Sequence, residues 1–288
     1  MSSSFLILTS GDLPEAYFLG AFLESVSQPF ALVNILGRPV SNQLRVLARL
    51  RRNRGVRCVA DILLARLANR LDGSFRGERS PRTMPAFPEI TAPLVREIRS
   101  RHPCLDCRDP HAEAVLDFVR RAAPDYILLA GAPILKPSFY GLARRVALNR
   151  HLGLLPDCRG SDCAVWAFAL DRPETVGYSI HLVSERVDGG DLILRRPLPV
   201  RGEPTLHHYL RRLRREASEA FVDVIGQLLR GVALRAAPQG GTGTYFPPAG
   251  WTIQRRALRK YRHLMSRLAA GTANDMPPPA PPAASRVS

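Results

Sequence analysis

Residues 149–156 read Asn-Arg-His-Leu-Gly-Leu-Leu-Pro, and the apolar run Asp-Tyr-Ile-Leu-Leu-Ala at residues 125–130 precedes them. The run at residues 125–130 predicts a buried strand, which Gly131 ends. Residues 145–149 predict a second short strand, so Asn149 also lies at the end of a strand. The sequence between the two suits a short helical connection. Together these features predict the strand, helix and strand repeat of an α/β fold.

The same alternation extends along the chain as far as residue 230. Further strands are expected at residues 5–9, 30–36, 178–183 and 192–194. Helices are expected at residues 13–25, 42–53, 57–71, 112–121 and 205–230, with two more opened by Pro137 and by a Ser161 cap. Strands alternating with helices predict a mostly parallel sheet with helices on both faces.

The chain divides by composition into three parts. Residues 1–235 carry the alternating pattern and are expected to form the catalytic domain. Residues 236–270 are predicted to be a C-terminal extension with a basic helix at 251–268. Residues 271–288 are rich in Pro and Ala and are predicted to be disordered. Residues 72–88 are expected to be a mobile loop.

The charge balance favours an anionic small molecule as the partner. The 288 residues carry a formal net charge of +16, from 41 basic and 25 acidic residues. Lys136 and Lys260 are the only lysines, and such a skew in a chain rich in Ala, Leu and Pro indicates a coding bias as much as a nucleic-acid surface. Arginine pairs well with phosphate. The basic helices at residues 42–71 and 251–268 could pack on the body or meet a membrane surface, and the sequence leaves this open.

The expected compartment and the expected state of the cysteines depend on whether the sequence contains a membrane span or an export signal. No apolar run is long enough to span a bilayer, and the N-terminus lacks the features of an export signal, so a cytoplasmic protein is expected. An odd number of cysteines then predicts free thiols. The five are Cys58, Cys104, Cys107, Cys158 and Cys163. Cys104 and Cys107, with His111 nearby, form an incomplete zinc set, because a structural site needs four ligands. No metal is expected, and the oligomeric state is left open.

The candidate chemistry lies in Asn149, His151 and Asp188. If an amine attacks a small carbonyl, an uncharged amide such as Asn149 can hold the oxyanion. His151, two residues on in an extended segment, points to the same side and can move a proton near neutral pH. Asp188 can orient the imidazole. Taken singly, each motif is more often an ordinary turn. His181, which alternates in the strand at 178–183, is expected to be structural.

The residues from 125 to 194 resemble the folate-dependent formyltransferase family. The shared features are Asn149 and His151, then Leu-Leu-Pro at 154–156, Arg-Gly at 159–160, Trp-Ala at 166–167, a strand ending in His181, and Asp-Gly-Gly at 188–190. The chain departs from the family at Leu152-Gly153 and at Cys158, where many relatives have Pro-Ser and Tyr. These changes are expected to alter the shape of the loop and not its chemistry.

The resemblance implies a Rossmann-like fold and a catalytic trio of Asn149, His151 and Asp188, which assist a tetrahedral intermediate. It also implies 10-formyltetrahydrofolate as the donor, with the pterin held chiefly by backbone groups of two segments. The implied residues are Gly131, Ala132, Pro133, Ile134 and Leu135 in the first, and Glu185 and Val187 in the second.

The acceptor is expected to be the primary amine of an amino sugar, nucleotide-linked in our preferred interpretation. The turn at residues 10–14 lacks the Gly-rich phosphate cradle of the glycinamide ribonucleotide branch, and the tail from Ala237 is too short for the C-terminal barrel of the methionyl-tRNA branch. A stand-alone sugar N-formyltransferase is the remaining match. Two alternatives stay open: a formyltetrahydrofolate hydrolase and a non-catalytic basic binding protein. Tyr245, Phe246 and Trp251 either enclose the acceptor or anchor the C-terminal segment.

Overall fold

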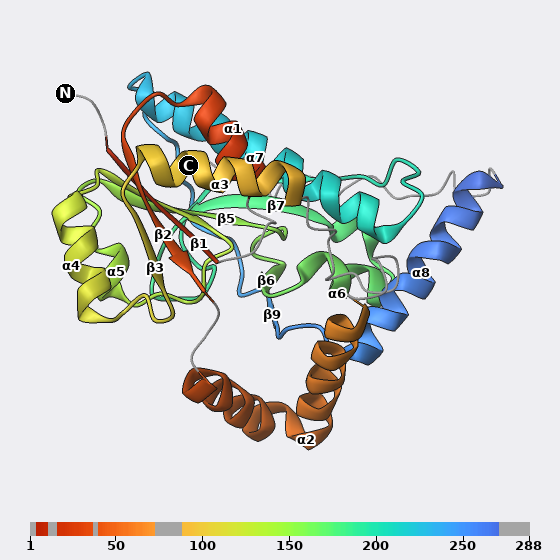
Figure 1. Ribbon diagram of the computed structural model, residues 1–288. Coiled ribbons are helices and arrows are strands. Elements are labelled where there is room, and N and C mark those ends of the chain that lie inside the picture. The colour runs from red at the N-terminus through yellow and green to blue at the C-terminus, as the bar shows by residue number, and fades with distance from the viewer. Residues whose placement is uncertain (1–3, 11–15, 37–39, 73–87, 271–288) are drawn as a thin grey trace.

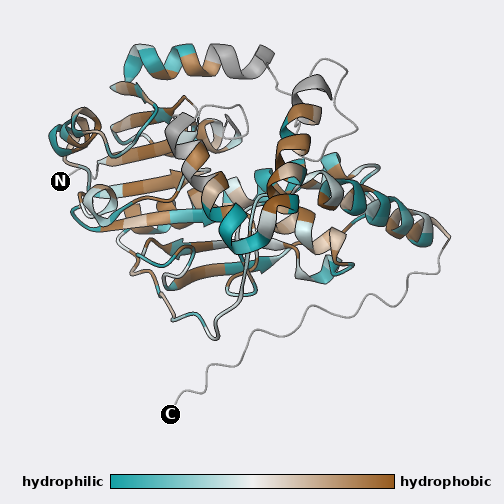
Figure 2. Ribbon diagram, turned by 90° about the horizontal axis from the view of Figure 1, so that it is seen from below, coloured by the Kyte–Doolittle hydropathy of each residue, from teal (hydrophilic) through white to brown (hydrophobic). Residues whose placement is uncertain are grey.

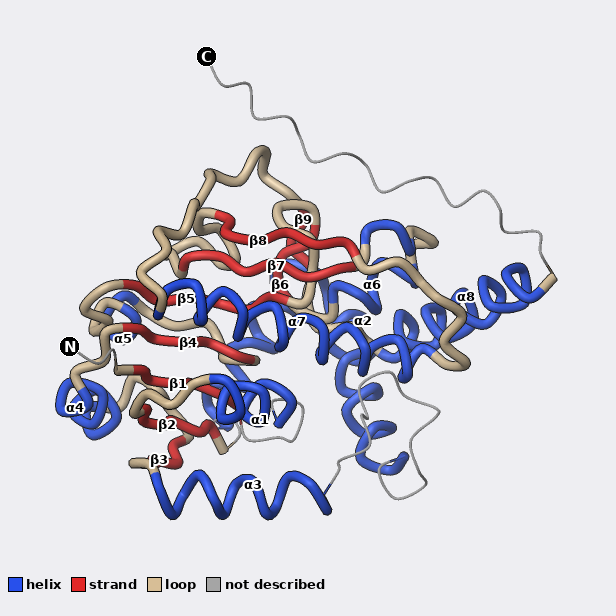
Figure 3. Tube along the Cα trace, turned by 90° about the horizontal axis from the view of Figure 1, so that it is seen from above, coloured by secondary structure: helices blue, strands red, loops and turns tan. Residues whose placement is uncertain are grey.

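A seven-stranded sheet forms the centre of the computed structural model, which describes residues 4–10, 16–36, 40–72 and 88–270. Its strand order is β3-β2-β1-β4-β5-β7-β8, which Figure 3 shows from above. The first five strands in this order are mutually parallel, and β7 and β8 join antiparallel. The strands are β1 (Phe5–Ser10), β2 (Phe30–Ile35), β3 (Cys104–Cys107), β4 (Tyr126–Ala130), β5 (Val146–His151), β7 (Gly177–Leu182) and β8 (Leu192–Pro197).

Alternate residues of β1 show how the sheet is covered on both faces. Phe5 and Ile7 belong to one apolar cluster, and Leu6 and Leu8 belong to the other. All four side chains are at most 1% exposed. A strand buried on both faces reads as a continuous apolar run, as residues 5–8 do.

The helices form two layers around the sheet (Figure 1). α1 (Ala16–Ser25), α3 (Pro88–Arg101), α6 (Cys163–Ala169), α7 (Leu206–Leu229) and α8 (Trp251–Ala269) contribute to the larger apolar cluster. α4 (Glu113–Ala122) and α5 (Pro137–Tyr140) cover the other face. A 3-10 turn, η2, spans Pro173–Thr175. Thr205 caps α7, because its side chain accepts a hydrogen bond from the amide of His208.

The helix α2 (Val40–Asp72) stands apart from the sheet and is bent at Gly55, where φ is 82°. Figure 1 shows its two arms meeting at this bend. The second arm packs on α8, where Asp61 accepts hydrogen bonds from Thr252. Ile62 and Ala65 of this arm are buried. α8 is largely hydrophilic (Figure 2). None of the helices within the described ranges combines the length and hydropathy needed to cross a membrane.

The predicted fold class is confirmed: the sheet is mostly parallel and helices lie on both faces. The bend at Gly55 separates the two helices predicted at 42–53 and 57–71. Three details differ. β5 continues to His151, so the Asn and His lie in one strand. The residue before α6 is Asp162 and not Ser161, and its side chain makes no capping bond. The sequence also did not predict α3, β3 or the two-stranded sheet of β6 (Cys158–Gly160) and β9 (Thr244–Phe246).

The predicted mobile loop at 72–88 falls almost entirely outside the described residues; Asp72 ends α2 and Pro88 begins α3. The predicted disordered tail at 271–288 lies wholly outside them.

Candidate active site

A cavity of about 910 Å³ opens at the carboxyl ends of β4 and β5. Parallel strands of an open α/β sheet end together there, and ligands commonly bind at this edge. The cavity wall includes Asn149, His151 and Asp188, which are the three residues predicted to act together. It also includes residues of α2 and of the segment 242–248, which lie far from them in the sequence.

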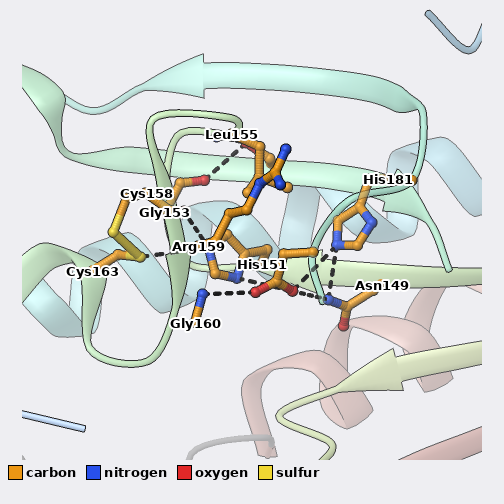
Figure 4. A network of polar contacts seen from close by, with 12 residues as sticks. Asn149, His151, Gly153, Leu155, Cys158, Arg159, Gly160, Cys163 and His181 are labelled. Carbon is orange, nitrogen blue, oxygen red and sulfur yellow. Dashed lines mark hydrogen bonds and ion pairs between the residues drawn. A yellow bond between two sulfur atoms is a disulfide. The ribbon is translucent and has the colours of Figure 1, made fainter. Parts of the chain in front are cut away.

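Asn149 and His151 face the same side of β5 because successive side chains of a strand alternate. Asp188 reaches them from the loop between β7 and β8. Its Oδ1 lies 3.4 Å from Asn149 Nδ2 and 3.6 Å from His151 Nδ1. The group of Asn149 that faces the carboxylate must be the amide NH₂, since the reverse orientation would set two oxygens against each other. The structure therefore brings the three side chains together, and Figure 4 shows Asn149 and His151 within one network of polar contacts.

His181 is a fourth member of this cluster. It pairs with Asn149 across β5 and β7, and its Nε2 lies 3.0 Å from Asn149 Nδ2. Its Nδ1 lies 2.7 Å from the carbonyl of Leu182, which can only accept, so the ring hydrogen is on Nδ1. Nε2 then accepts from Asn149. His181 thus orients the amide, in addition to the structural role expected from the sequence.

Burial and nearby charges set the protonation states of His151 and Asp188. Desolvation lowers the pKa of the buried His151 below its usual value of 6.5, although the Asp188 carboxylate raises it in part. Burial raises the pKa of Asp188, but His151, His181 and the Gly160 amide outweigh it and lower the pKa to about 2. At neutral pH the imidazole is therefore neutral and the carboxylate ionised.

The hydrogen bonds of His151 identify its free nitrogen. Nε2 lies 2.9 Å from the carbonyl oxygen of Cys158, so Nε2 carries the hydrogen and donates it. The lone pair is then on Nδ1, the nitrogen that faces Asp188. A proton arriving at Nδ1 would convert a contact between two acceptors into an ion pair. The arrangement suits a base that takes up a proton during a reaction.

The backbone at Asp188 is held in an unusual conformation by residues from other parts of the chain. Its φ is 49°, in the left-handed region. The amide of Gly160 donates to Asp188 Oδ2 at 2.8 Å. Gln239 Nε2 donates to the carbonyls of Asp188 and Gly190 at 2.9 and 2.7 Å. Arg159 in turn donates to Gln239 Oε1 at 3.0 Å, so the buried guanidinium braces the loop.

All of the residues predicted to hold the pterin line the cavity. They are Gly131, Ala132, Pro133, Ile134 and Leu135 on one side, and Glu185 and Val187 in the loop after β7. Ser10 Oγ donates to the carbonyl of Gly131 at 2.6 Å and fixes the start of the first segment. Of the three aromatic residues left open, Tyr245 lines the cavity, whereas Phe246 packs on Trp166 with ring centroids 5.2 Å apart.

The contributions of α2 and Gln239 to the site were not predicted from the sequence. Arg49, Leu50, Asn53 and Arg54 of α2 all line the cavity. No local motif marks these positions, because only the packing of α2 on α8 brings them to the site. His181 did carry a signal, its alternation in a strand antiparallel to the one that bears Asn149.

The prediction of five free thiols is wrong for Cys158 and Cys163, which form a disulfide. The chain turns back between β6 and α6 through Gly160 and Asp162, with φ of 94° and 55°. This turn brings the two Cα atoms to 5.8 Å, within the range of about 4.4–6.8 Å that disulfides occupy. Cys163 Sγ lies 3.5 Å from His151 Nε2, so the bond forms part of the site wall.

Cys104, Cys107 and His111 are not grouped as three metal ligands within the described part of the chain. Burial raises the pKa of Cys107 to about 11, so the thiol stays protonated. His111 Nε2 accepts from the amide of Lys136 at 3.0 Å. Across the ranges that the structure describes, no group of three or more His, Cys, Asp or Glu side chains is arranged to hold a metal ion.

Comparison by sequence finds the model of the family described as formyl transferase over residues 80–225, just over half of the chain. A methionyl-tRNA formyltransferase of Chlorobium phaeovibrioides is 31% identical over 129 residues, which are 45% of this chain and 40% of that protein. One from Akkermansia muciniphila is 30% identical over 162 residues, 55% of this chain and 51% of that protein. The chain thus matches only about half the length of these curated relatives.

Comparison by structure finds the same fold in proteins of low identity. A sugar N-formyltransferase of a Shewanella species aligns with a TM-score of 0.53 at 13% identity, over 90% of this chain and 87% of that chain. A phosphoribosylglycinamide formyltransferase of Coxiella burnetii aligns with a TM-score of 0.52 at 17% identity, over 86% and 100% of the two chains. Each likeness concerns the fold alone.

Proposed function

The chain belongs to the formyl transferase family, and from that premise we propose that it transfers a formyl group from 10-formyltetrahydrofolate to a primary amine. The acceptor we favour is an amino sugar carrying a nucleotide. The observation that carries this proposal is the convergence of Asn149, His151 and Asp188, from two separate segments, on the wall of one cavity.

The cavity fits a folate donor in size and in lining. Its volume of about 910 Å³ is near the upper end of the range, about 300–1,000 Å³, common for small-molecule sites. Leu129, Ile134, Val183 and Val187 supply apolar surface for a flat ring system. The backbone of residues 131–135 and of residues 184–188 would hold the polar edge of the pterin. The bound donor supplies the formyl carbonyl.

Each member of the trio has a distinct task in this proposal. Asn149 donates an amide hydrogen to the negative charge that develops on the carbonyl oxygen. The bond to the carbonyl oxygen would replace the longer of the two contacts that the Asn149 amide makes, the one of 3.4 Å to Asp188. His151 accepts the proton lost by the attacking amine at Nδ1 and later returns it to the leaving nitrogen. Asp188 stabilises the imidazolium while it exists, since it stays ionised.

Location in the cytoplasm remains part of the proposal. Disulfides are uncommon in that compartment because thiol reductants open them. Cys158 and Cys163 are 7% and 4% exposed, so burial shields their bond from such reductants.

Product analysis tests the proposed function. The purified protein is incubated with 10-formyltetrahydrofolate, with and without a panel of amino sugars and nucleotide-linked amino sugars. We expect formylated amine and little formate in the presence of the correct acceptor. Formate released at full speed without any amine would instead identify a hydrolase. A protein that neither binds a folate analogue nor consumes the donor would support the non-catalytic alternative.

A further inference from the structure

The first arm of α2 forms part of the cavity wall. Arg49, Leu50, Asn53 and Arg54 line the cavity, and positions spaced in this way share one face of a helix. Arg54 Nη2 donates to the carbonyl of Tyr245 at 3.4 Å, which ties the arm to the segment 242–248. α2 lies outside residues 80–225, the segment that matches the family model. It is therefore a feature of this chain that the family segment does not account for.

The lining of the cavity is strongly basic. Six arginines and three acidic residues contribute to it, a net formal charge of +3. The arginines are Arg49, Arg54, Arg150, Arg159, Arg186 and Arg214, and the acidic residues are Asp162, Glu185 and Asp188. A concave surface of one sign concentrates ligands of the opposite sign. The cavity thus favours a ligand that carries negative charge away from the carbonyl and amine that react.

Most of these guanidinium groups already have partners within the protein. Arg150 donates to Ser218, Arg159 to Gln239 and Arg186 to the carbonyl of Thr242. The exposed Arg49, in contrast, makes no hydrogen bond or ion pair within the part of the chain that the structure describes. Arg54 is exposed as well, and among the described residues its one polar contact is the long one to Tyr245. The two arginines of α2 therefore have donors to offer a ligand.

We propose that Arg49 and Arg54 bind a phosphate or diphosphate group of the acceptor. The planar guanidinium presents paired N–H donors that match two phosphate oxygens, and Arg–phosphate hydrogen bonds are among the stronger ones in proteins. α2 then selects acceptors that carry phosphate, while the trio acts on their amine. This inference rests on the proposed function, because it assigns the anionic part of the same acceptor.

Equilibrium binding tests this site without any turnover. Inorganic pyrophosphate and UDP are titrated into the full-length protein by calorimetry, with uridine as the uncharged control. We expect pyrophosphate and UDP to bind and uridine not to bind. The double variant R49A/R54A is expected to bind UDP about tenfold to a hundredfold more weakly, since two charge-assisted bonds are lost. Each single variant is expected to show part of this loss.

The matched control is R51A/R52A, which removes the same charge from exposed positions of the same helix that do not line the cavity. We expect its UDP affinity to stay within about twofold of the wild type, because distant exposed charges are screened by salt. Equal losses in both double variants would overturn the inference, because the attraction would then be general. The inference would also be overturned if the wild-type protein bound no pyrophosphate. It would be overturned as well if the wild type bound malonate, a dianion without phosphate, as tightly as pyrophosphate.

The outcome is separable from that of the proposed function. If the protein formylates an amine but R49A/R54A binds UDP normally, only the phosphate site is wrong. If UDP binding depends on Arg49 and Arg54 but no formyl group is transferred, only the proposed reaction is wrong.

Discussion

His151 and His181 lie on either side of the Asp188 carboxylate, each with one ring nitrogen 3.6 Å from Oδ1. Their other nitrogens donate to different backbone carbonyls, so a ring hydrogen is on Nε2 in His151 and on Nδ1 in His181. His151 has its lone pair on Nδ1. The lone pair of His181 is on Nε2 and faces the Asn149 amide. The Asp188 carboxylate is thus next to His151, which can act as a base, and next to His181, which orients the Asn149 amide.

A titration of the imidazoles tests this assignment. Because burial lowers the pKa of His151, we expect its ring to become charged only below pH 6.5. The Asp188 charge raises that pKa in part, so Asp188→Asn should move it lower still. Nitrogen-15 NMR of histidine-labelled protein measures both values, and His151→Asn identifies the resonance. A His151 pKa at or above 6.5 would contradict the role of a neutral base.

At the scale of elements, the turn after β7 depends on close backbone contact at Gly190. A Cβ placed there would meet the carbonyl oxygen of Leu182 at 1.9 Å, so the backbone itself would have to move. Gly190→Ala should cost about 1–3 kcal/mol of stability, as overpacking does, and should lower activity because Asp188 belongs to the same turn. Gly240→Ala is the matched control, since a Cβ there meets nothing within 4 Å. Thermal melts of both variants measure the difference; equal melts would show that the turn adapts.

The elements that could be predicted from the sequence are those whose apolar residues form a continuous run or recur at regular spacing. The runs at 5–9 and 125–130 and the long α7 are buried on the expected positions. β3 and β9 were missed because they are short and only partly buried. α3 begins at Pro88 and has another proline at position 93, and such residues suggest a loop. The cysteine pair was missed because its geometry depends on a turn with two positive φ values.

At the scale of the whole molecule, segments far from the trio complete the site. Gln239 lies in the predicted extension at 236–270, yet it holds the carbonyls of Asp188 and Gly190. α2 forms part of the cavity wall, although it precedes residues 80–225, the segment that matches the family model. The trio could be predicted because Asn149 and His151 share a short motif. Gln239 and α2 could not, because tertiary packing alone brings them to the cavity. The division into domains remains a prediction.

Removing Gln239 tests whether the extension positions the catalytic turn. Gln239→Ala loses two hydrogen bonds to Asp188 and Gly190 and should reduce kcat by about tenfold to a hundredfold through misplacement of Asp188. Gln227→Ala, which alters a half-buried glutamine on α7, is the control and should leave kcat unchanged. Steady-state kinetics on both variants provide the comparison. An unaltered kcat in Gln239→Ala would mean that the turn holds its shape unaided.

In the proposed reaction, Asn149, His151 and the ionised Asp188 act together on one carbonyl. Its most direct test is single-turnover transfer of a carbon-13 formyl group from 10-formyltetrahydrofolate to the amine acceptor, measured by mass spectrometry. The wild type is compared with Asp188→Asn and with Asp191→Asn, a control three residues away in the same loop. We predict that Asp188→Asn folds, binds the donor and transfers the label about 10²–10⁴ times more slowly, while Asp191→Asn keeps the wild-type rate. A folded Asp188→Asn protein that transfers the label at the wild-type rate would show that the carboxylate has no part in the transfer.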